Sequence, residues 1–201
     1  HQKLVLSRLG VIATGSAGES KDGIFRIVTC SRVVNLKRLH LIPEILKLLE
    51  IEVEWIHIGD GPGFKDLKQQ TEAINKRNIK YQLLGHLTPI EVSKFYSIQS
   101  VDLFMNVSES EGVPVSIMEA LSAGIPVMAT NVGGTAELID GNVGFLLDKD
   151  FVPLTAAQWI VDFIKMNDEE KKTYRGNAVE RFENMCRADK LADNLAHLLL
   201  T

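Results

Sequence analysis

Cysteine is scarce in this chain, whose 201 residues include only Cys30 and Cys186. The two lie far apart in sequence, and Cys30 belongs to a strand-like apolar run. This pattern is typical of buried free thiols in a reducing compartment rather than of a disulfide framework. A continuous apolar run of about 18 residues, which a membrane-spanning helix needs, is missing. No signal-peptide pattern is visible either. These absences predict a cytoplasmic protein.

Positive charge is not in surplus. Lysine and arginine number 22 against 26 aspartates and glutamates, which gives a formal net charge of −4. Domains that bind nucleic acid normally carry a basic surface, so we expect no nucleic-acid partner. His40, His57 and His197 lack metal-site spacing with cysteines or carboxylates, which predicts that the protein holds no metal. With 45% apolar and 24% charged residues, the composition is that of a globular α/β protein, with one substantial domain or two small ones.

Short apolar runs alternate with helical patterns as far as Asp148. Several of these runs are apolar on both faces, as in a parallel sheet that helices cover on both sides. The pattern predicts an α/β fold with a Rossmann-like, doubly wound parallel sheet, followed by C-terminal helices. The expected strands are Ile24–Cys30, Val53–Gly59, Ile79–Leu84, Val101–Val107, Pro126–Thr130 and Gly144–Leu147. The expected helices are Leu39–Glu50, Gly63–Lys76, Pro89–Gln99, Pro114–Ala123, Thr135–Ile139, Val152–Met166, Asp168–Glu183 and Arg187–Leu200.

The first residues do not fit the start of such a sheet. Lys3–Val11 is an expected short strand, and Ala13–Lys21 is an expected loop rich in glycine and serine. We therefore divide the chain into a linker, residues 1–22, and a folded domain, residues 23–201.

The most informative stretch holds two carboxylates, Glu111 and Glu119, on either side of an expected helix start at Pro114. Proline suits the first helical position because its φ is fixed and its missing N–H is not needed there. The free N–H groups of Val115 and Ser116, with the positive end of the helix dipole behind them, attract phosphate. Carboxylates beside such a helix start accept hydrogen bonds from hydroxyls. A nucleotide-sugar, with phosphates in the middle and polyols at both ends, would satisfy the whole stretch.

Two basic residues, Arg32 and Lys37, follow the first expected strand. Ligands of open α/β sheets bind beyond the carboxyl ends of the strands, so both residues are placed to meet a diphosphate. Arginine offers a planar fork to phosphate oxygens and lysine a point charge. Such cations would stabilise the charge that accumulates on a departing diphosphate. A solvated basic loop is the alternative for this segment taken alone. We interpret Arg38, the next residue, as part of a helix surface.

The two glutamates resemble part of a known signature. Glu111-x7-Glu119, followed by Ala120–Val127 and by Gly133-Gly134-x-x-Glu137, is similar to the motif of retaining GT-B glycosyltransferases, in family 4 of the glycosyl transferases group 1. The resemblance implies that Glu119 binds the ribose hydroxyls and that Glu111 contacts the transferred sugar. It implies catalytic roles for Arg32, Lys37 and Glu111. It also implies that backbone groups hold the sugar and phosphates, at Gly112, Val113, Val115 and Ser116. Pro114 departs from the pattern, because the family often has glycine there and proline cannot donate a hydrogen bond.

The resemblance extends to the ends of other strands. Gly59 lies in a tight turn that matches the family's second strand-end loop, with a plain turn as the alternative. Leu84 and His86 match the loop that cradles the nucleotide base, where His86 either contacts the base or is a solvated loop residue. Gly133–Thr135 either adds N–H groups to the site or is a structural turn.

The resemblance implies the donor-binding, C-terminal half of a two-domain enzyme. Such an enzyme moves a sugar from a UDP-, GDP- or ADP-sugar to a hydroxyl of a glycan or lipid-linked acceptor, in polysaccharide or glycolipid synthesis, without a cofactor. The acceptor would bind an N-terminal domain, through which the protein could also associate with the inner membrane. A GT-B-type nucleotide-sugar epimerase and a non-catalytic nucleotide-sugar-binding subunit are alternatives. A glycosidase also uses two carboxylates, but it needs neither Arg32 and Lys37 nor a phosphate-binding helix start.

Overall fold

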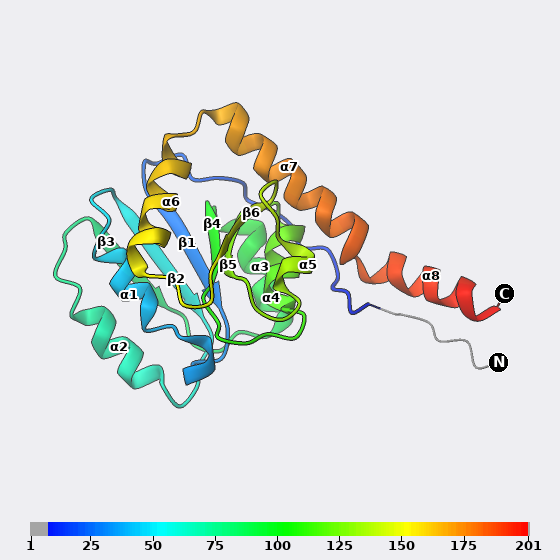
Figure 1. Ribbon diagram of the computed structural model, residues 1–201, viewed down its shortest axis with the longest axis horizontal. Helices are drawn as coiled ribbons and strands as arrows, with labels where there is room; N and C mark the ends of the chain where they lie inside the picture. The colour runs from blue at the N-terminus through cyan, green and yellow to red at the C-terminus, as the bar shows by residue number, and fades with distance from the viewer. Residues whose placement is uncertain (1–7, 201) are drawn as a thin grey trace.

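A computed structural model describes residues 8–200, the last of them by its backbone alone, and shows a six-stranded sheet in which all neighbours are parallel (Figure 1). The strand order is β3-β2-β1-β4-β5-β6. The predicted Rossmann-like α/β fold is therefore confirmed. The strands are β1 (Phe25–Cys30), β2 (Val53–Ile58), β3 (Ile79–Leu83), β4 (Leu103–Asn106), β5 (Val127–Thr130) and β6 (Gly144–Leu147).

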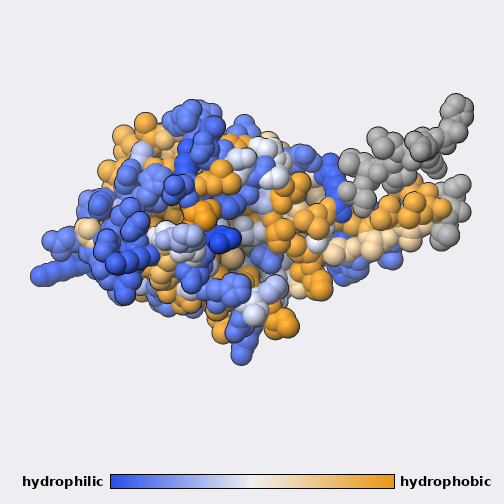
Figure 2. All heavy atoms as spheres, turned by 90° about the horizontal axis from the view of Figure 1, so that it is seen from below, coloured by the Kyte–Doolittle hydropathy of each residue, from blue (hydrophilic) through white to orange (hydrophobic). Residues whose placement is uncertain are grey.

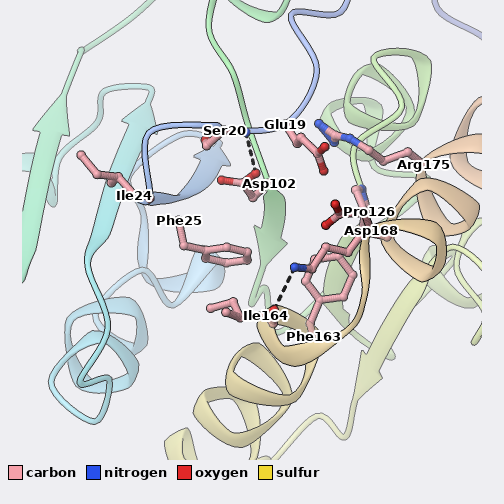
Figure 3. A pocket seen from close by; sticks show the side chains of 12 residues that line it. Glu19, Ser20, Ile24, Phe25, Asp102, Pro126, Phe163, Ile164, Asp168 and Arg175 are labelled. Carbon is pink, nitrogen blue, oxygen red and sulfur yellow. Dashed lines mark hydrogen bonds between the residues drawn. The ribbon is translucent and has the colours of Figure 1, made fainter.

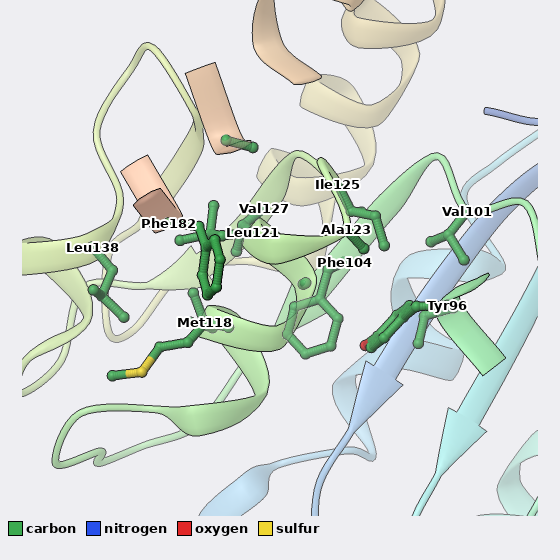
Figure 4. Packing of buried hydrophobic residues seen from close by; sticks show 14 of the residues in the cluster. Tyr96, Val101, Phe104, Met118, Leu121, Ala123, Ile125, Val127, Leu138 and Phe182 are labelled. Atoms are coloured by element: carbon green, nitrogen blue, oxygen red, sulfur yellow. The ribbon is translucent and has the colours of Figure 1, made fainter. Parts of the chain in front are cut away.

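Helices cover both faces of the sheet. The α-helices are α1 (Leu41–Leu46), α2 (Phe64–Glu72), α3 (Pro89–Ile98), α4 (Val115–Ser122), α5 (Thr135–Leu138), α6 (Pro153–Lys165), α7 (Asp168–Met185) and α8 (Ala188–Leu200). A 3-10 turn, η1 (Asn35–Lys37), precedes α1. Buried residues of α1, α2 and α6 form one apolar layer with the sheet, and those of α3, α4, α5 and α7 form the other. Figure 4 shows the second layer, where Phe104 of β4 lies among Tyr96, Met118 and Phe182.

The direction of winding reverses between β1 and β4. The chain runs from β1 outward through β2 to β3, and then returns to place β4 on the other side of β1. Ile27 pairs with Leu103 and Val28 with Phe104, and all four side chains are fully buried. In open α/β sheets the crevice at this reversal, beyond the carboxyl ends of the strands, is where ligands bind.

The N-terminal segment contacts the junction between α7 and α8. Val11 forms a parallel bridge with Arg187, in which its N–H donates to the Cys186 carbonyl at 2.8 Å. The predicted strand Lys3–Val11 is not confirmed: residues 3–7 lie outside the described residues, and residues 8–10 are not strand. From this junction α8 extends away from the body of the domain. Figure 2 shows apolar side chains along it, where Leu198 and Leu199 are exposed.

Several predicted helices begin or end elsewhere: Gly63–Lys76, for example, is observed as α2 and ends at Glu72. Two further differences have local reasons. Pro114 has extended backbone angles (φ −75°, ψ 107°) and caps α4 instead of starting it, and its carbonyl accepts from the N–H of Ile117 at 3.1 Å. The predicted helix Leu39–Glu50 is reduced to α1. After α1 the chain turns tightly, and the Lys76 ammonium binds the carbonyls of Lys47 at 3.1 Å and Leu49 at 2.9 Å in the segment that follows the helix.

Candidate functional site

An open cleft of about 690 Å³ lies beyond the carboxyl ends of β1 and β2. Its shape depends on Gly59, whose φ of 138° is forbidden to most side chains and where a Cβ atom would stand 1.9 Å from the Ser31 carbonyl oxygen. The N–H of Gly59 donates to the Gly85 carbonyl at 2.7 Å, so the loops after β1, β2 and β3 meet at this residue. Arg32, Gly59 and His86, three of the predicted site residues, line this one cleft.

Arg32 is exposed on the wall of the cleft. The backbone on either side is fixed, because the Ser31 N–H donates to the Ile58 carbonyl and the Val33 N–H to the Asp60 carbonyl, both at 3.0 Å. The Arg32 guanidinium itself has no hydrogen bond or ion pair with any residue in the range 8–200. An anchored loop thus presents an unpaired cation to the cleft.

Lys37 and Glu111 contact each other directly. The Lys37 ammonium lies 2.7 Å from Glu111 Oε1, and the Asn106 amide donates to the same oxygen at 2.9 Å. The Glu111 side chain is only 9% exposed. Burial opposes ionisation, but hydrogen bonds from Lys37, Ser108 and Asn106 outweigh it and hold the pKa of Glu111 below its ordinary value. Glu111 is therefore charged at neutral pH.

Asn106 is a residue of this site that the sequence interpretation missed. It ends β4, and while its amide binds Glu111, its Oδ1 accepts from the Ser108 N–H at 3.0 Å. The Thr130 hydroxyl donates to the Ser108 carbonyl from the neighbouring strand. A polar residue that ends a buried strand immediately before the glutamate motif was the signal that could have identified it.

Glu119 has the opposite electrostatic setting. Its side chain is partly buried in α4, and no hydrogen bond or ion pair to its carboxylate occurs in the described part of the chain. Burial raises the pKa of Glu119, and the pKa of the nearby Cys30 thiol is raised to about 12 by burial and by the Glu119 charge. Near it, the N–H groups of Val115 and Ser116 at the start of α4 have no acceptor among residues 8–200. The helix start thus offers an unpartnered carboxylate and two free donors.

The Gly133-Gly134 turn supports the loop that carries Glu111. Gly133 has φ 53°, and a Cβ atom there would stand 1.7 Å from the Glu111 carbonyl oxygen. The Gly134 N–H donates to the Gly112 carbonyl at 2.8 Å, and the Thr135 N–H to the Val132 carbonyl. Of the two interpretations of this turn, the structural one holds for Gly134 and Thr135, because their N–H groups are used inside the protein. Gly112 and Val113 remain exposed on the outer side of this loop.

Leu84 and His86 follow β3 and are both exposed, but only His86 lines the cleft. The Leu84 N–H donates to the carbonyl of His57, which is fully buried in β2. His57 Nδ1 and the Thr29 hydroxyl are 2.8 Å apart, and Trp55 Nε1 donates to that hydroxyl. Burial lowers the pKa of His57 to about 4, so this histidine is a neutral part of the core.

Our interpretation of Arg38 as part of a helix surface is wrong. It follows η1 with left-handed backbone angles (φ 46°, ψ 34°), the region that favours glycine. Its side chain reaches across to the loop before Glu111, where Nε donates to the Val107 carbonyl at 2.8 Å. The resembling family often has glycine at this place, and that was the signal for a left-handed turn which the helix interpretation set aside.

A second pocket, of about 190 Å³, lies at the opposite ends of the strands and contains none of the predicted site residues (Figure 3). Its main cation, Arg175, donates to the carbonyls of Val101 and Gly124, and Asp102 accepts from the N–H groups of Ser20 and Arg26. These groups tie segments of the domain together.

No group of three or more His, Cys, Asp or Glu side chains among the described residues could hold a metal ion. The absence of a bound metal remains a prediction. Between residues 8 and 200, no helix is long and apolar enough to cross a membrane.

The comparison with known families decides the identity. Residues 16–181 match the family described as glycosyl transferases group 1. The chain belongs to this family. It is 32% identical over 137 residues to the O-antigen biosynthesis glycosyltransferase WbnH of Escherichia coli, covering 63% of this chain and 38% of WbnH. It is 25% identical to the putative colanic acid biosynthesis glycosyltransferase WcaL of Salmonella typhimurium, covering all of this chain and 52% of WcaL.

A solved structure of a glycosyltransferase fold agrees. HepE of Anabaena, in complex with UDP and glucose, superimposes with a TM-score of 0.75 at 24% identity, covering 89% of this chain and 49% of HepE. This likeness shows that the group 1 member described here has the Rossmann-like fold found in GT-B glycosyltransferases. The chain spans about half, or less, of the length of these relatives.

Proposed function

We propose that this chain is the nucleotide-sugar-binding part of a retaining glycosyltransferase, which transfers a sugar from a UDP-, GDP- or ADP-sugar to a hydroxyl of a glycan or lipid-linked acceptor. One observation carries the proposal. Arg32, the Lys37–Glu111 pair and the start of α4 with Glu119 all follow the carboxyl ends of β1 and β4 at the reversal of the sheet, and among residues 8–200 neither the Arg32 guanidinium nor the Glu119 carboxylate has a partner. The names of WbnH and WcaL, and the UDP bound by HepE, support it.

Each part of the donor has a partner in this arrangement. The cleft volume of about 690 Å³ lies within the usual range of ligand pockets, about 300–1,000 Å³. In the proposal, Arg32, Lys37 and the free N–H groups of α4 bind the diphosphate. Glu119 accepts hydrogen bonds from the ribose, and Glu111 contacts the sugar. The remaining proposed contacts involve the loops of Gly59, Leu84, His86, Gly112 and Val113.

The chemistry follows from the charges. Transfer breaks the bond between the anomeric carbon and the diphosphate oxygen and forms one to the acceptor oxygen, whose proton goes to the departing diphosphate. Negative charge builds up on that group, where the cations Arg32 and Lys37 stabilise it. Positive charge develops on the sugar ring, where the ionised Glu111 carboxylate lowers its energy. Acceptor binding and orientation are assigned to a second domain, joined through the linker of residues 1–22.

The 201-residue chain should bind at least one of UDP, GDP and ADP, because every proposed nucleotide contact lies within it. We expect modest affinity, since closure of a second domain contributes to donor binding in such enzymes. Titration calorimetry and thermal shift would measure it, and a ligand at 100 times its Kd should stabilise the fold by about 2.7 kcal/mol. The matching nucleoside, which lacks phosphates, serves as control and should bind far more weakly. No heat and no stabilisation with all three diphosphates would contradict the proposal.

Glu119→Gln should weaken nucleotide binding by roughly 1.5–3 kcal/mol, the range for a hydrogen bond to a charged group. The same change should make the ligand-free protein more stable at pH 7. Burial raises the folded pKa of Glu119 above an unfolded value of about 4.3. The ionised carboxylate therefore opposes folding, and wild-type stability falls as the pH rises through that interval.

Calorimetry and thermal melts from pH 4 to pH 8 test both effects. The stability gain of Glu119→Gln should shrink as the pH falls toward 4. The matched control is Glu44→Gln, an exposed glutamate of α1, which should change neither property. A folded Glu119→Gln variant that binds nucleotide as tightly as wild type would rule out the ribose contact.

A further inference from the structure

Three successive residues bind one segment of the site. The carbonyl of Leu36 accepts from the Glu109 N–H at 2.8 Å, and the Lys37 ammonium contacts Glu111 Oε1 at 2.7 Å. Arg38 Nε donates to the Val107 carbonyl at 2.8 Å. A backbone bond, an ion pair and a guanidinium bond thus connect η1 and its cap to the loop Val107–Glu111. The position of Glu111 relative to Lys37 depends on all three.

The backbone conformation of Arg38, which this arrangement requires, is strained. Arg38 is the one non-glycine residue with positive φ in the described part of the chain. This region is sterically strained for a residue with a Cβ atom, whereas glycine enters it freely. The strain persists only because the surroundings hold it.

The contacts of the Arg38 side chain hold this backbone conformation. Besides the Val107 carbonyl, its guanidinium donates to the Lys149 carbonyl at 2.7 Å and to the Ser108 carbonyl at 3.4 Å. It also lies over the ring of Phe151, 5.8 Å from the centroid. The loops after β1, β4 and β6 are joined at this one group. Lys149 reinforces the junction through its ion pair with Glu109 at 3.5 Å.

We propose that Arg38 is a positioning residue for sugar transfer, which holds the loop of Glu111 against η1 so that Lys37 and Glu111 keep the separation the reaction requires. This inference rests on the function proposed above. Catalytic groups must stay within about 0.5 Å of their working geometry, and a displacement of about 1 Å can lower a rate a hundredfold. Lysine cannot replace Arg38, because a point charge cannot donate to several carbonyls in a fixed fork.

The deciding variant is Arg38→Gly in the complete transferase, because glycine removes the guanidinium and also relieves the backbone strain. The readouts are thermal unfolding, binding of UDP, GDP and ADP, and nucleoside diphosphate release from UDP-glucose, GDP-mannose and ADP-glucose as probes. We expect a fall in kcat of about ten- to a hundredfold, with nucleotide affinity and donor KM changed less than about threefold. Nucleotide contacts through Arg32, α4 and Glu119 are untouched by the change. Millimolar guanidinium ion should restore part of kcat in Arg38→Gly.

Arg38→Lys and Arg77→Ala complete the set. Folded Arg38→Lys should lose at least about fivefold in kcat, and it decides the matter alone if Arg38→Gly does not fold. Arg77, an exposed arginine before β3, is the control whose loss should leave kcat unchanged. Wild-type kcat in folded Arg38→Gly or Arg38→Lys would overturn the inference, as would an equal loss of nucleotide affinity and kcat. A wild-type enzyme that neither binds nor cleaves any of the three donors overturns the proposed function, and the inference falls with it.

Discussion

Arg32→Ala should lower kcat of the complete transferase by at least about a hundredfold, the effect of removing a preorganised charge from a transition state. Donor KM should rise less, because the interaction strengthens as the diphosphate departs. The melting temperature should stay unchanged, since the Arg32 guanidinium has no partner among residues 8–200 whose pairing could be lost. Steady-state kinetics with the tightest-binding donor measures the effect.

Two further variants sharpen the test of Arg32. Arg32→Lys keeps the charge but not the planar fork, so its kcat should lie between wild type and Arg32→Ala. Arg77→Ala removes an exposed arginine far from the cleft and should leave kcat unchanged. A wild-type kcat in Arg32→Ala would rule out its role at the diphosphate.

Lys37→Met should likewise lower kcat at least about a hundredfold, but it should also destabilise the protein. The change leaves the Glu111 carboxylate, 9% exposed, with Asn106 but without its cation. We expect a loss of about 1–3 kcal/mol, the cost of an unsatisfied buried polar group. Lys37 helps to hold the pKa of Glu111 low. The stability that this pairing gives is therefore present above the unfolded pKa of about 4.3 and disappears as the pH falls through the folded value.

The double variant Lys37→Met/Glu111→Gln separates stability from activity. Removing both charges should recover part of the lost stability, since no unpaired carboxylate remains. It should not recover kcat, because neither the Lys37 cation at the diphosphate nor the Glu111 carboxylate at the sugar is then present. Denaturant titrations at pH 7 and pH 4, with kinetics on the same samples, measure both quantities. Recovered kcat in the double variant would contradict the roles given to this pair.

Most of the sheet could be predicted from sequence because its inner strands are largely apolar and buried, whereas the edge strand β3 exposes three of its five residues. Gly144–Leu147 is observed with the predicted bounds, and β1, β2, β3 and β5 differ by one residue at one end. Such runs have no other stable place than the middle of a covered sheet. The bounds of α1 were wrong because the tertiary contacts of Lys76, from a distant segment, close the chain after it. The apolar periodicity of the Leu39–Glu50 segment contains no information about its contact with Lys76.

The candidate site was predictable as a set of residues but not as a geometry. The motif around Glu111 and Glu119 is local in sequence, and the family match agrees with the group to which it pointed. The Lys37–Glu111 contact joins the segment after β1 to the loop after β4, and nothing in the sequence of either segment indicates that the two meet. Arg38 was misread because propensity places arginine in helices, while here three carbonyls hold it in a left-handed turn. Retention of configuration, the acceptor and the donor base remain predictions.

The position of the site at the reversal of the sheet also sets an order of events during synthesis. Arg32 and Lys37 leave the ribosome just after β1, whereas Glu111 and Glu119 follow β4, which is made only after β2 and β3. At about 5–20 residues per second, the basic half of the site precedes the acidic half by on the order of ten seconds. In that interval one edge of β1 has no neighbour, and an open edge invites pairing with other chains. Because β4 covers this edge of β1 and Glu111 and Glu119 follow β4 directly, a nascent chain that binds nucleotide has already closed that edge.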